Sequence, residues 1–301
     1  MKNNVDAWLF YSGNVYDKKK ENGYIDKIIK KAHDEYGFNL EVYSSHKFIV
    51  VSGKENTLYY DNEEVKSVPK VVVMRRYEIY LGRQLELMGA KVYNNIQSLI
   101  DARNKMKIHQ MLASNHVNTP KTIYIVPKKN LSNIKYKDAC SILGNKFVMK
   151  WIYGSQGKHV FLVDNEDEFN RIVKKYEGKV LCQEYLKASY GMDIRAYVIG
   201  GKYIGAAIRK SNGDFRSNLA RGGEAIKFEY DKRVEDIALK AAHASNMDIC
   251  GVDILLGDDH EYYICEVNGV PGFKSLNRTM GINEQDILLT LIKDKLKEIN
   301  N

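Results

Sequence analysis

The sequence lacks the features that define several classes of protein. In its 301 residues no apolar run approaches the roughly 18–20 residues that a membrane-spanning helix needs, so we expect no membrane segment. The first residues, Met1–Tyr11, are too short and polar for a signal peptide and predict a first strand instead. Low-complexity linkers and internal repeats are also lacking. What remains is an ordinary globular composition, with 44% hydrophobic and 28% charged residues.

Cysteine is scarce, and its spacing matches no metal-binding pattern. The four cysteines are Cys140, Cys182, Cys250 and Cys265, and three of them lie in apparent strands. Isolated cysteines of this kind are typical of free, buried thiols. We therefore expect a reducing, cytoplasmic location and no structural zinc.

Acidic residues are fewer than basic ones, 38 against 46, which gives a net charge of +8. A basic surface attracts nucleic acids, nucleotides and acidic substrates alike. The clusters at Lys18–Lys20 and Lys128–Lys129 are too short for a nucleic-acid arm, and no nucleic-acid motif is present. The charge therefore indicates a solvated basic surface without a dedicated nucleic-acid site.

The order of expected elements divides the chain into three parts. Residues 1–100 alternate strands and helices, which predicts a small parallel α/β layer. Residues 101–182 begin with a helical segment over 101–117 and continue as mixed α/β structure. Residues 183–301 predict a mainly antiparallel sheet, with a hairpin turning at Gly200–Gly201. The fold class is thus α/β, with α+β character in the C-terminal part.

The most informative stretch is Gly251–Asn268, in which two apolar runs flank a Gly-Asp-Asp-His turn. This pattern predicts a β-hairpin with a four-residue loop. If the residues that border the turn pair with each other, Asp253, Glu266 and Asn268 share one surface-facing side of the sheet. The carboxylates then lie diagonally across two strands, with little nearby to neutralise them. Such oxygen ligands suit Mg²⁺ bound to phosphates, although both carboxylates could simply face water.

A second stretch joins two expected strands through a glycine-rich turn. The turn Gly154–Gly157 follows Lys150 and precedes Lys158 and His159. Small residues with free backbone N–H groups, flanked by lysines, can fold over phosphates. The alternative is a plain strand connection, in which Lys150 is an ordinary exposed lysine.

A third stretch concentrates arginine in a polar loop. After Asp193 and Arg195, the loop Gly213–Gly223 contains Arg216 and Arg221 among glycine, serine and asparagine. Arginine offers planar, bidentate donors for phosphate or carboxylate, which suits a loop that grips a polyanion. A solvated surface loop would have a similar composition.

Together these stretches resemble an ATP-grasp ligase of the RimK-like branch, the ribosomal-protein glutamate ligase type. The matching motifs occur in order at Lys150–Gly157, Gln183–Leu186, 193–195, 213–218, 221–223, 251–255 and 266–272. Similarity runs from about Val71 to Asn283, and the first 70 residues match only in general α/β character. The resemblance implies an ATP-grasp fold with an N-terminal α/β domain (1–100), a central lid subdomain (101–182) and a C-terminal antiparallel-sheet subdomain with the metal site (183–301).

The resemblance also implies roles for individual residues. The implied catalytic residues are Arg216, Asn218 and Lys150. The implied ATP-binding residues are Lys105, Lys150, Ser155, Gln156, Gly157, Gln183, Glu184, Tyr185, Leu186, Asp193, Arg216, Ser217 and Asn218. The implied magnesium ligands are Asp253, Glu266 and Asn268, the residues that the hairpin pattern had already placed on one face.

The activity that the resemblance implies is an ATP- and Mg²⁺-dependent carboxylate–amine ligation through an acylphosphate, with Mn²⁺ as a possible substitute ion. The implied partners are ATP, a carboxylate substrate and an amine, commonly glutamate, which is added to a peptide, a protein or a small acid. Two other functions stay open: an ATP-grasp kinase that phosphorylates its substrate and stops, and a nucleotide-binding sensor without turnover. Whether the chain forms an oligomer is also open.

Overall fold

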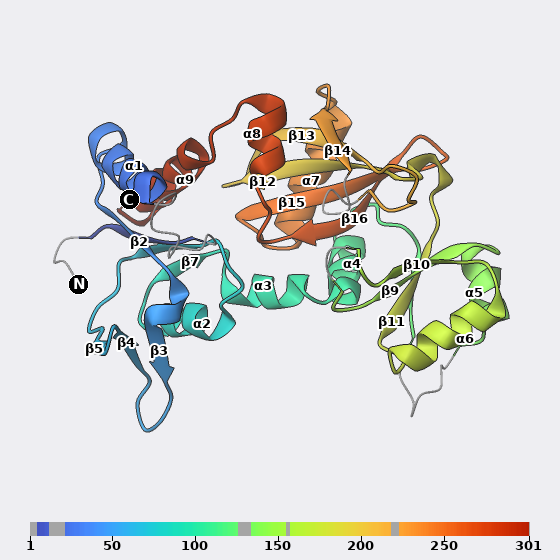
Figure 1. Cartoon of the computed structure of the whole chain (residues 1–301), viewed down its shortest axis with the longest axis horizontal. Helices are drawn as coiled ribbons and strands as arrows, with labels where there is room; N and C mark the ends of the chain where they lie inside the picture. The colour runs from blue at the N-terminus through green and yellow to red at the C-terminus, as the bar shows by residue number, and fades with distance from the viewer. Residues whose placement is uncertain (1–4, 12–21, 126–133, 155–156, 218–222, 301) are drawn as a thin grey trace.

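The computed structural model describes residues 5–11, 22–125, 134–154, 157–217 and 223–300, which form four sheets with helices packed against them (Figure 1). In this described part of the chain, no helix is both long enough and apolar enough to cross a membrane. The chain has the expected mixed α/β character, with one parallel sheet and three antiparallel ones.

The N-terminal sheet is parallel, as its alternating strands and helices predicted. In sheet order its strands are β2 (Leu40–Tyr43), β1 (Ala7–Phe10), β6 (Val71–Met74) and β7 (Lys91–Tyr93). Strands β1 and β6 are buried at every residue, because both faces of the sheet are covered. One face packs against α1 (Asn22–Lys31), the π-helical turn Ala32–Tyr36 and α9 (Glu284–Asn300). The other face packs against α2 (Ile79–Leu87) and α3 (Ile96–Ala102).

A small antiparallel sheet, which the sequence analysis did not anticipate, lies beside this layer (Figure 1). It contains β3 (Phe48–Val51), β4 (Thr57–Tyr60) and β5 (Glu63–Glu64), and the 3₁₀ turn Ser45–Lys47 precedes it. Phe48 and Tyr60 pack their rings against Tyr43, so this sheet extends the aromatic core of the parallel layer.

The central sheet is antiparallel and lies at the opposite end of the molecule from the parallel layer (Figure 1). In sheet order its strands are β10 (Val160–Val163), β9 (Phe147–Trp151), β11 (Val180–Glu184) and β8 (Thr122–Tyr124). Helices α5 (Tyr136–Leu143) and α6 (Glu166–Lys175) pack against it and share its apolar core.

The C-terminal sheet has five antiparallel strands. Their order is β14 (Glu224–Lys227), β13 (Lys202–Lys210), β12 (Met192–Ile199), β15 (Ile249–Leu256) and β16 (Tyr262–Asn268). The expected hairpin between β12 and β13 turns at Gly200 and Gly201, whose φ angles of 57° and 73° favour glycine. One face of the sheet packs against α4 (Lys105–Ser114) and α7 (Lys232–Ala244). Helix α8 (Lys274–Met280) follows β16.

Two helical expectations need correction. The single helix expected over 101–117 is wrong, because α3 ends at Ala102 and α4 begins at Lys105. Asn104 separates them: its side chain accepts a hydrogen bond from the Lys107 backbone N–H at 3.2 Å and caps α4. The expectation of a mainly antiparallel sheet over residues 183–301 did not include α9, which packs with the N-terminal sheet in one core.

Candidate active site

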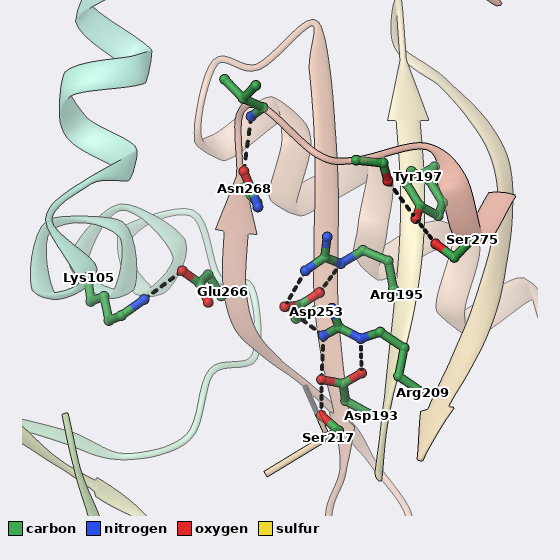
Figure 2. A network of polar contacts seen from close by, with 12 residues as sticks. Lys105, Asp193, Arg195, Tyr197, Arg209, Ser217, Asp253, Glu266, Asn268 and Ser275 are labelled. Atoms are coloured by element: carbon green, nitrogen blue, oxygen red, sulfur yellow. Dashed lines mark hydrogen bonds and ion pairs between the residues drawn. The ribbon is translucent and has the colours of Figure 1, made fainter. Parts of the chain in front are cut away.

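The two faces of the five-stranded sheet differ in character. The face toward α4 and α7 is apolar, with Ile194, Val252 and Ile264 in its core. Strand alternation places Arg195 and Asp253 on the opposite face, where charged side chains gather (Figure 2). The candidate site is therefore one side of a sheet whose other side holds it in place.

The β15–β16 hairpin forms, but the register expected from the sequence is wrong. Asp253 lies directly opposite Glu266, not diagonally from it, for two reasons. Leu256 pairs with Tyr262 rather than with Glu261, and the register shifts by one more residue after Ile254 pairs with Ile264. Cys265 is the extra residue of this β-bulge. The bulge lets Ile264 enter the core while Glu266 and Asn268 lie on the face of Asp253, so the expected shared face is confirmed.

Asp253 lies in a network of buried charges (Figure 2). Arg195 donates to Asp253 through Nε and through Nη2, the latter at 2.7 Å to Oδ2. Arg209 Nη2 lies 2.8 Å from the same Asp253 oxygen and also binds Asp193, to which its Nε donates at 2.6 Å. Ser217 donates its hydroxyl to Asp193. Two guanidinium groups and two carboxylates thus balance one another inside the protein.

The expectation that Asp253 faces the surface with little to neutralise it is wrong. The residue is 6% exposed and has two arginines beside it. Burial alone would raise the pKa of Asp253, but the charges of Arg195 and Arg209 lower it to about 2. The carboxylate is therefore ionised at neutral pH.

Glu266 and Asn268 have other partners on the same face (Figure 2). Lys105 Nζ, at the first turn of α4, lies 2.5 Å from Glu266 Oε1. Burial would lower the pKa of Lys105, but Glu266 and Asp253 raise it, so the lysine is charged. Asn268 Oδ1 accepts from the Val270 N–H at 3.0 Å.

The donor set fits Mg²⁺. Asp253 and Glu266 supply carboxylates and Asn268 an amide oxygen, all hard ligands of the kind Mg²⁺ takes alongside phosphate oxygens. The described part of the chain contains no group of three histidine, cysteine, aspartate or glutamate residues that could hold a metal ion by themselves. Any cation that binds here has to replace the arginines and Lys105 as the partner of these carboxylates.

Lys150, on β9 of the central sheet, reaches the β15–β16 hairpin. The residue is only 8% exposed. Its Nζ donates to Gln183 Oε1 at 2.6 Å and to Cys265 Sγ at 3.2 Å. Because Cys265 precedes Glu266, Lys105 and Lys150 contact consecutive residues of β16. Two lysines from different parts of the chain thus meet at the hairpin.

A buried hydrogen-bond chain orients Lys150. Gln183 Oε1 has to face the lysine, which can only donate, so Gln183 Nε2 donates to His109 Nε2 at 3.0 Å. The proton of His109 is then on Nδ1 and is donated to Thr119, whose hydroxyl donates to the Ile264 carbonyl at 3.1 Å. Burial lowers the pKa of His109 to about 3, with Lys150 and Lys105 adding to the effect, which keeps the imidazole neutral. Every hydrogen bond in this series is therefore donated in the same direction, from Lys150 toward the Ile264 carbonyl.

Three of the implied ATP-binding residues, Glu184, Tyr185 and Leu186, lie where the central sheet leads into the C-terminal one. Glu184 ends β11 and exchanges two hydrogen bonds with Lys121: its N–H donates to the Lys121 carbonyl at 2.9 Å, and its carboxylate accepts from the Lys121 N–H at 3.2 Å. Leu186 is 8% exposed, and the Tyr185 ring lies 5.8 Å from Lys146 Nζ.

Arg216 connects the polar loop to the central sheet. Its guanidinium pairs with Asp214 at 2.6 Å and donates to the carbonyls of Gly157 and Val160 at 3.1 and 3.3 Å. In this conformation Arg216 holds the strand that leaves the glycine-rich turn. The expected site residues Ser155, Gln156 and Asn218, and the neighbouring Arg221, lie outside the described residues.

Two residues of the site escaped the sequence analysis. Arg209 is directly opposite Asp193 in the β12–β13 register, and counting from the predicted Gly200–Gly201 turn would have placed it within one residue of that position. His109 lies on the buried side of α4, and a lone histidine on an apolar helix face carries no signal that distinguishes it from core.

A family model described as the RimK-like ATP-grasp domain matches residues 102–292. The chain belongs to this family. The probable alpha-L-glutamate ligase of Vibrio parahaemolyticus is 26% identical over 94% of this chain and 96% of its own length. The beta-citrylglutamate synthase B of Danio rerio is 30% identical over 81% of this chain, and the match spans 62% of the length of that larger relative.

Solved structures show that the chain has the ATP-grasp fold. The ATP-grasp ligase PsnB, complexed with a minimal precursor, superposes with a TM-score of 0.69 at 17% identity over 98% of this chain and 99% of PsnB. The D-alanine–D-alanine ligase of Bacillus anthracis superposes with a TM-score of 0.66 at 17% identity in its complex with ATP, over 99% of this chain and 100% of that one.

The two candidate metal carboxylates differ in burial, so we expect their substitution to affect stability differently. Asp253→Asn breaks a buried ion network and should lower the free energy of unfolding by about 3–5 kcal/mol. Glu266→Gln should lower it by no more than about 1 kcal/mol, because the Glu266 side chain is 40% exposed. Chemical denaturation of both variants at pH 7 measures the difference.

The pH dependence gives a second check on Asp253. A carboxylate whose pKa is lowered on folding stabilises the protein above its unfolded pKa of about 3.9. That contribution is lost as the pH falls toward the folded value of about 2. The stability difference between wild type and Asp253→Asn should therefore shrink below about pH 4. Equal unfolding free energies for Asp253→Asn and Glu266→Gln at pH 7 would contradict the buried network.

The series of hydrogen bonds that orients Lys150 predicts a role for His109 in ATP binding. His109→Leu removes an acceptor from Gln183, and the loss of one buried hydrogen bond should weaken ATP affinity about tenfold, roughly 1.4 kcal/mol. His109→Gln retains an acceptor and should recover most of the affinity. Because the pKa of His109 is about 3, the difference between wild type and His109→Leu should stay constant from pH 5 to 8. Calorimetric titration with ATP measures this, with His243→Leu, at an exposed position of α7, as the matched control.

Proposed function

We propose that the protein is an ATP- and Mg²⁺-dependent carboxylate–amine ligase that forms an amide bond. The observation that carries the proposal is that Lys105 and Lys150 contact Glu266 and Cys265, two consecutive residues of the strand that pairs with the strand of Asp253. Two lysines that can bind phosphates thus lie beside oxygen ligands that can bind Mg²⁺. The family supports this reading, because its relatives are named ligases and synthases.

The names of the relatives support a substrate class. The zebrafish protein is named for citrylglutamate, the mouse relative is an N-acetylaspartylglutamate synthase A, and the Vibrio protein is an alpha-L-glutamate ligase. Glutamate is common to all three names. We therefore propose glutamate as the amine substrate and an acid as its acceptor, either a small molecule or a peptide. A peptide substrate has a parallel in the PsnB structure that contains a precursor peptide.

We propose that ATP lies between the central and C-terminal sheets. The residues proposed to contact it are Lys105, Lys150, Ser155, Gln156, Gly157, Gln183, Glu184, Tyr185, Leu186, Asp193, Arg216, Ser217 and Asn218. Asp253, Glu266 and Asn268 would hold Mg²⁺, and a PsnB structure that contains Mg and ADP supports this pairing of ion and nucleotide. Mn²⁺ is proposed as a substitute ion. The division at residues 100 and 182 into N-terminal, lid and C-terminal parts remains a proposal, as does the cytoplasmic location inferred from the cysteines.

The proposed chemistry solves a leaving-group problem. A carboxylate does not acylate an amine in water, because its oxygen is a poor leaving group. Transfer of the γ-phosphoryl group of ATP to that oxygen gives an acylphosphate and ADP. The amine nitrogen then attacks the carbonyl carbon, the C–N bond forms, the C–O bond to phosphate breaks, and the amine loses a proton.

The residues of the chain contribute mainly by position and charge. Bound Mg²⁺ would neutralise charge on the phosphates. Lys105 and Lys150 would hold phosphate oxygens, and phosphoryl transfer depends chiefly on such positioning. Arg216 is the proposed contact to the transferred group and the acceptor carboxylate, which requires it to leave the carbonyls of Gly157 and Val160.

Incubation with ATP, Mg²⁺, L-glutamate and an acid tests the proposal, with N-acetylaspartate, citrate and an acidic peptide as the acids. We expect a product one glutamate residue heavier than the acid, formed in step with ADP and read by mass spectrometry. Lys150→Met should reduce its rate at least a hundredfold. Lys240→Met, at an exposed position of α7, should not change the rate.

The same assay separates the alternatives. A product heavier by one phosphate group would identify a kinase. Nucleotide binding without any product from these acids would favour a sensor.

A further inference from the structure

A buried arginine lies at the carboxyl-end edge of the parallel sheet, and it is not among the residues proposed to bind ATP or Mg²⁺. Arg75 directly follows β6 and is 3% exposed. Ligands of open α/β sheets bind beyond the carboxyl ends of the strands, and Arg75 occupies that edge. A guanidinium is strongly destabilised by burial unless its charge and its donors are matched.

The donors of Arg75 are only partly matched. Its Nη2 donates to the Pro271 carbonyl at 2.6 Å, and its Cζ lies 4.1 Å from the centre of the Phe273 ring. Its Nε and Nη1 are buried and have no hydrogen-bond partner among the described residues. Each buried donor without a partner costs about 1–3 kcal/mol, so the arrangement lacks an acceptor.

The carboxylate beside Arg75 does not supply that acceptor. Glu284, the first residue of α9, lies 3.6 Å from Arg75 Nη2, which is longer than a hydrogen bond. Burial raises the pKa of Glu284, and Arg75 opposes that effect. The Glu284 side chain is 24% exposed, so its position can be reached from solvent while the donors behind it are covered.

A second unmatched group lies on the same edge. The Tyr24 hydroxyl is buried without a hydrogen-bond partner in the described part of the chain, and both Glu284 and Arg75 influence its pKa. Burial raises the pKa of Tyr24, so the hydroxyl keeps its proton and can donate it. Its ring stacks on Tyr11, which follows β1, at 4.9 Å. Arg75 and Tyr24 thus both have buried donors without an acceptor among the described residues.

The position connects this edge with the metal face. Pro271 and Phe273, which contact Arg75, belong to the loop that follows Asn268. Asn94, which follows β7, holds the start of that loop by donating to the Gly269 carbonyl at 2.8 Å. A ligand bound at Arg75 would therefore lie next to the loop that leaves the proposed magnesium ligands.

We propose that Arg75 and Tyr24 bind a substrate carboxylate that does not react, and that Glu284 occupies its place when the substrate is absent. The inference rests on the proposed function, which requires substrates with carboxylates beyond the one that is phosphorylated. An arginine fork that binds a carboxylate through two hydrogen bonds recognises planar geometry as well as charge. The carboxylate belongs either to the amine substrate or to the acceptor acid.

Direct binding tests this inference without turnover, so it is independent of whether ligation is observed. The full chain is titrated calorimetrically with L-glutamate and, separately, with N-acetylaspartate. One of the two should bind wild type, and Arg75→Lys should weaken that binding at least tenfold. The same substitution should leave ATP affinity within twofold. The affected probe identifies which substrate supplies the carboxylate.

Three further variants separate ligand binding from structural support. Tyr24→Phe removes only an unmatched hydroxyl, so it should weaken binding severalfold without lowering the melting temperature. Glu284→Gln removes the competing charge and should strengthen binding severalfold. Arg76→Lys, at the half-exposed neighbour of Arg75, is the matched control and should change nothing.

Several results would overturn the assignment. One is that neither probe binds wild type. Another is that Arg75→Lys and Tyr24→Phe leave the affinity of the probe unchanged. If Glu284→Gln lowers the melting temperature and weakens binding, Glu284 is a structural partner of Arg75 that fastens α9 to the sheet, and the proposal fails.

Discussion

The pairing of Arg195 and Arg209 with Asp253 and Asp193 is the interaction on which the site depends. Four charges lie on one face of a sheet: Asp193, Arg195 and Asp253 are buried, and the Arg209 side chain is 11% exposed. A single buried charge is costly, whereas a balanced set with bidentate hydrogen bonds is tolerated. Each member therefore fixes the position of the others. The apolar core on the far side of the sheet gives this network a rigid base.

The same pairing limits how ligands can bind. Mg²⁺ cannot reach Asp253 while two arginines hold it, and Lys105 cannot bind a phosphate while it holds Glu266. Mg²⁺ and ATP carry opposite charges, so together they can replace both sets of partners. The metal would take the carboxylates, and the phosphates would take the freed cations. Without ligands, the ion pairs would therefore keep both the carboxylates and the cations in position until Mg²⁺ and ATP replace them together.

Much of the fold follows from local patterns in the sequence. Alternation of strands and helices over residues 1–100 predicted the parallel layer. The hairpin at Gly200–Gly201 followed from its turn residues, since both need a positive φ. The shared face of Asp253 and Glu266 also followed from strand alternation, although through the wrong register.

The features that escaped prediction depend on contacts distant in sequence or on single backbone irregularities. The bulge at Cys265 shifts the register by one residue, and no local pattern marks it. Helix α9 packs with strands from the first hundred residues, which periodicity within α9 cannot reveal. The burial of Asp253 depends on Arg209, which lies on β13, two strands away from β15 in the sheet. From its residue type alone, Asp253 was predicted to be a solvated carboxylate.

A crystal structure of the protein with a non-hydrolysable ATP analogue and Mg²⁺ tests the exchange of partners most directly. The account predicts Mg²⁺ on Asp253, Glu266 and Asn268. It also predicts that Lys105 leaves Glu266 for a phosphate oxygen, and that at least one of the two arginines leaves Asp253. An analogue bound with the metal elsewhere, and with Asp253 still paired to both arginines, would contradict it.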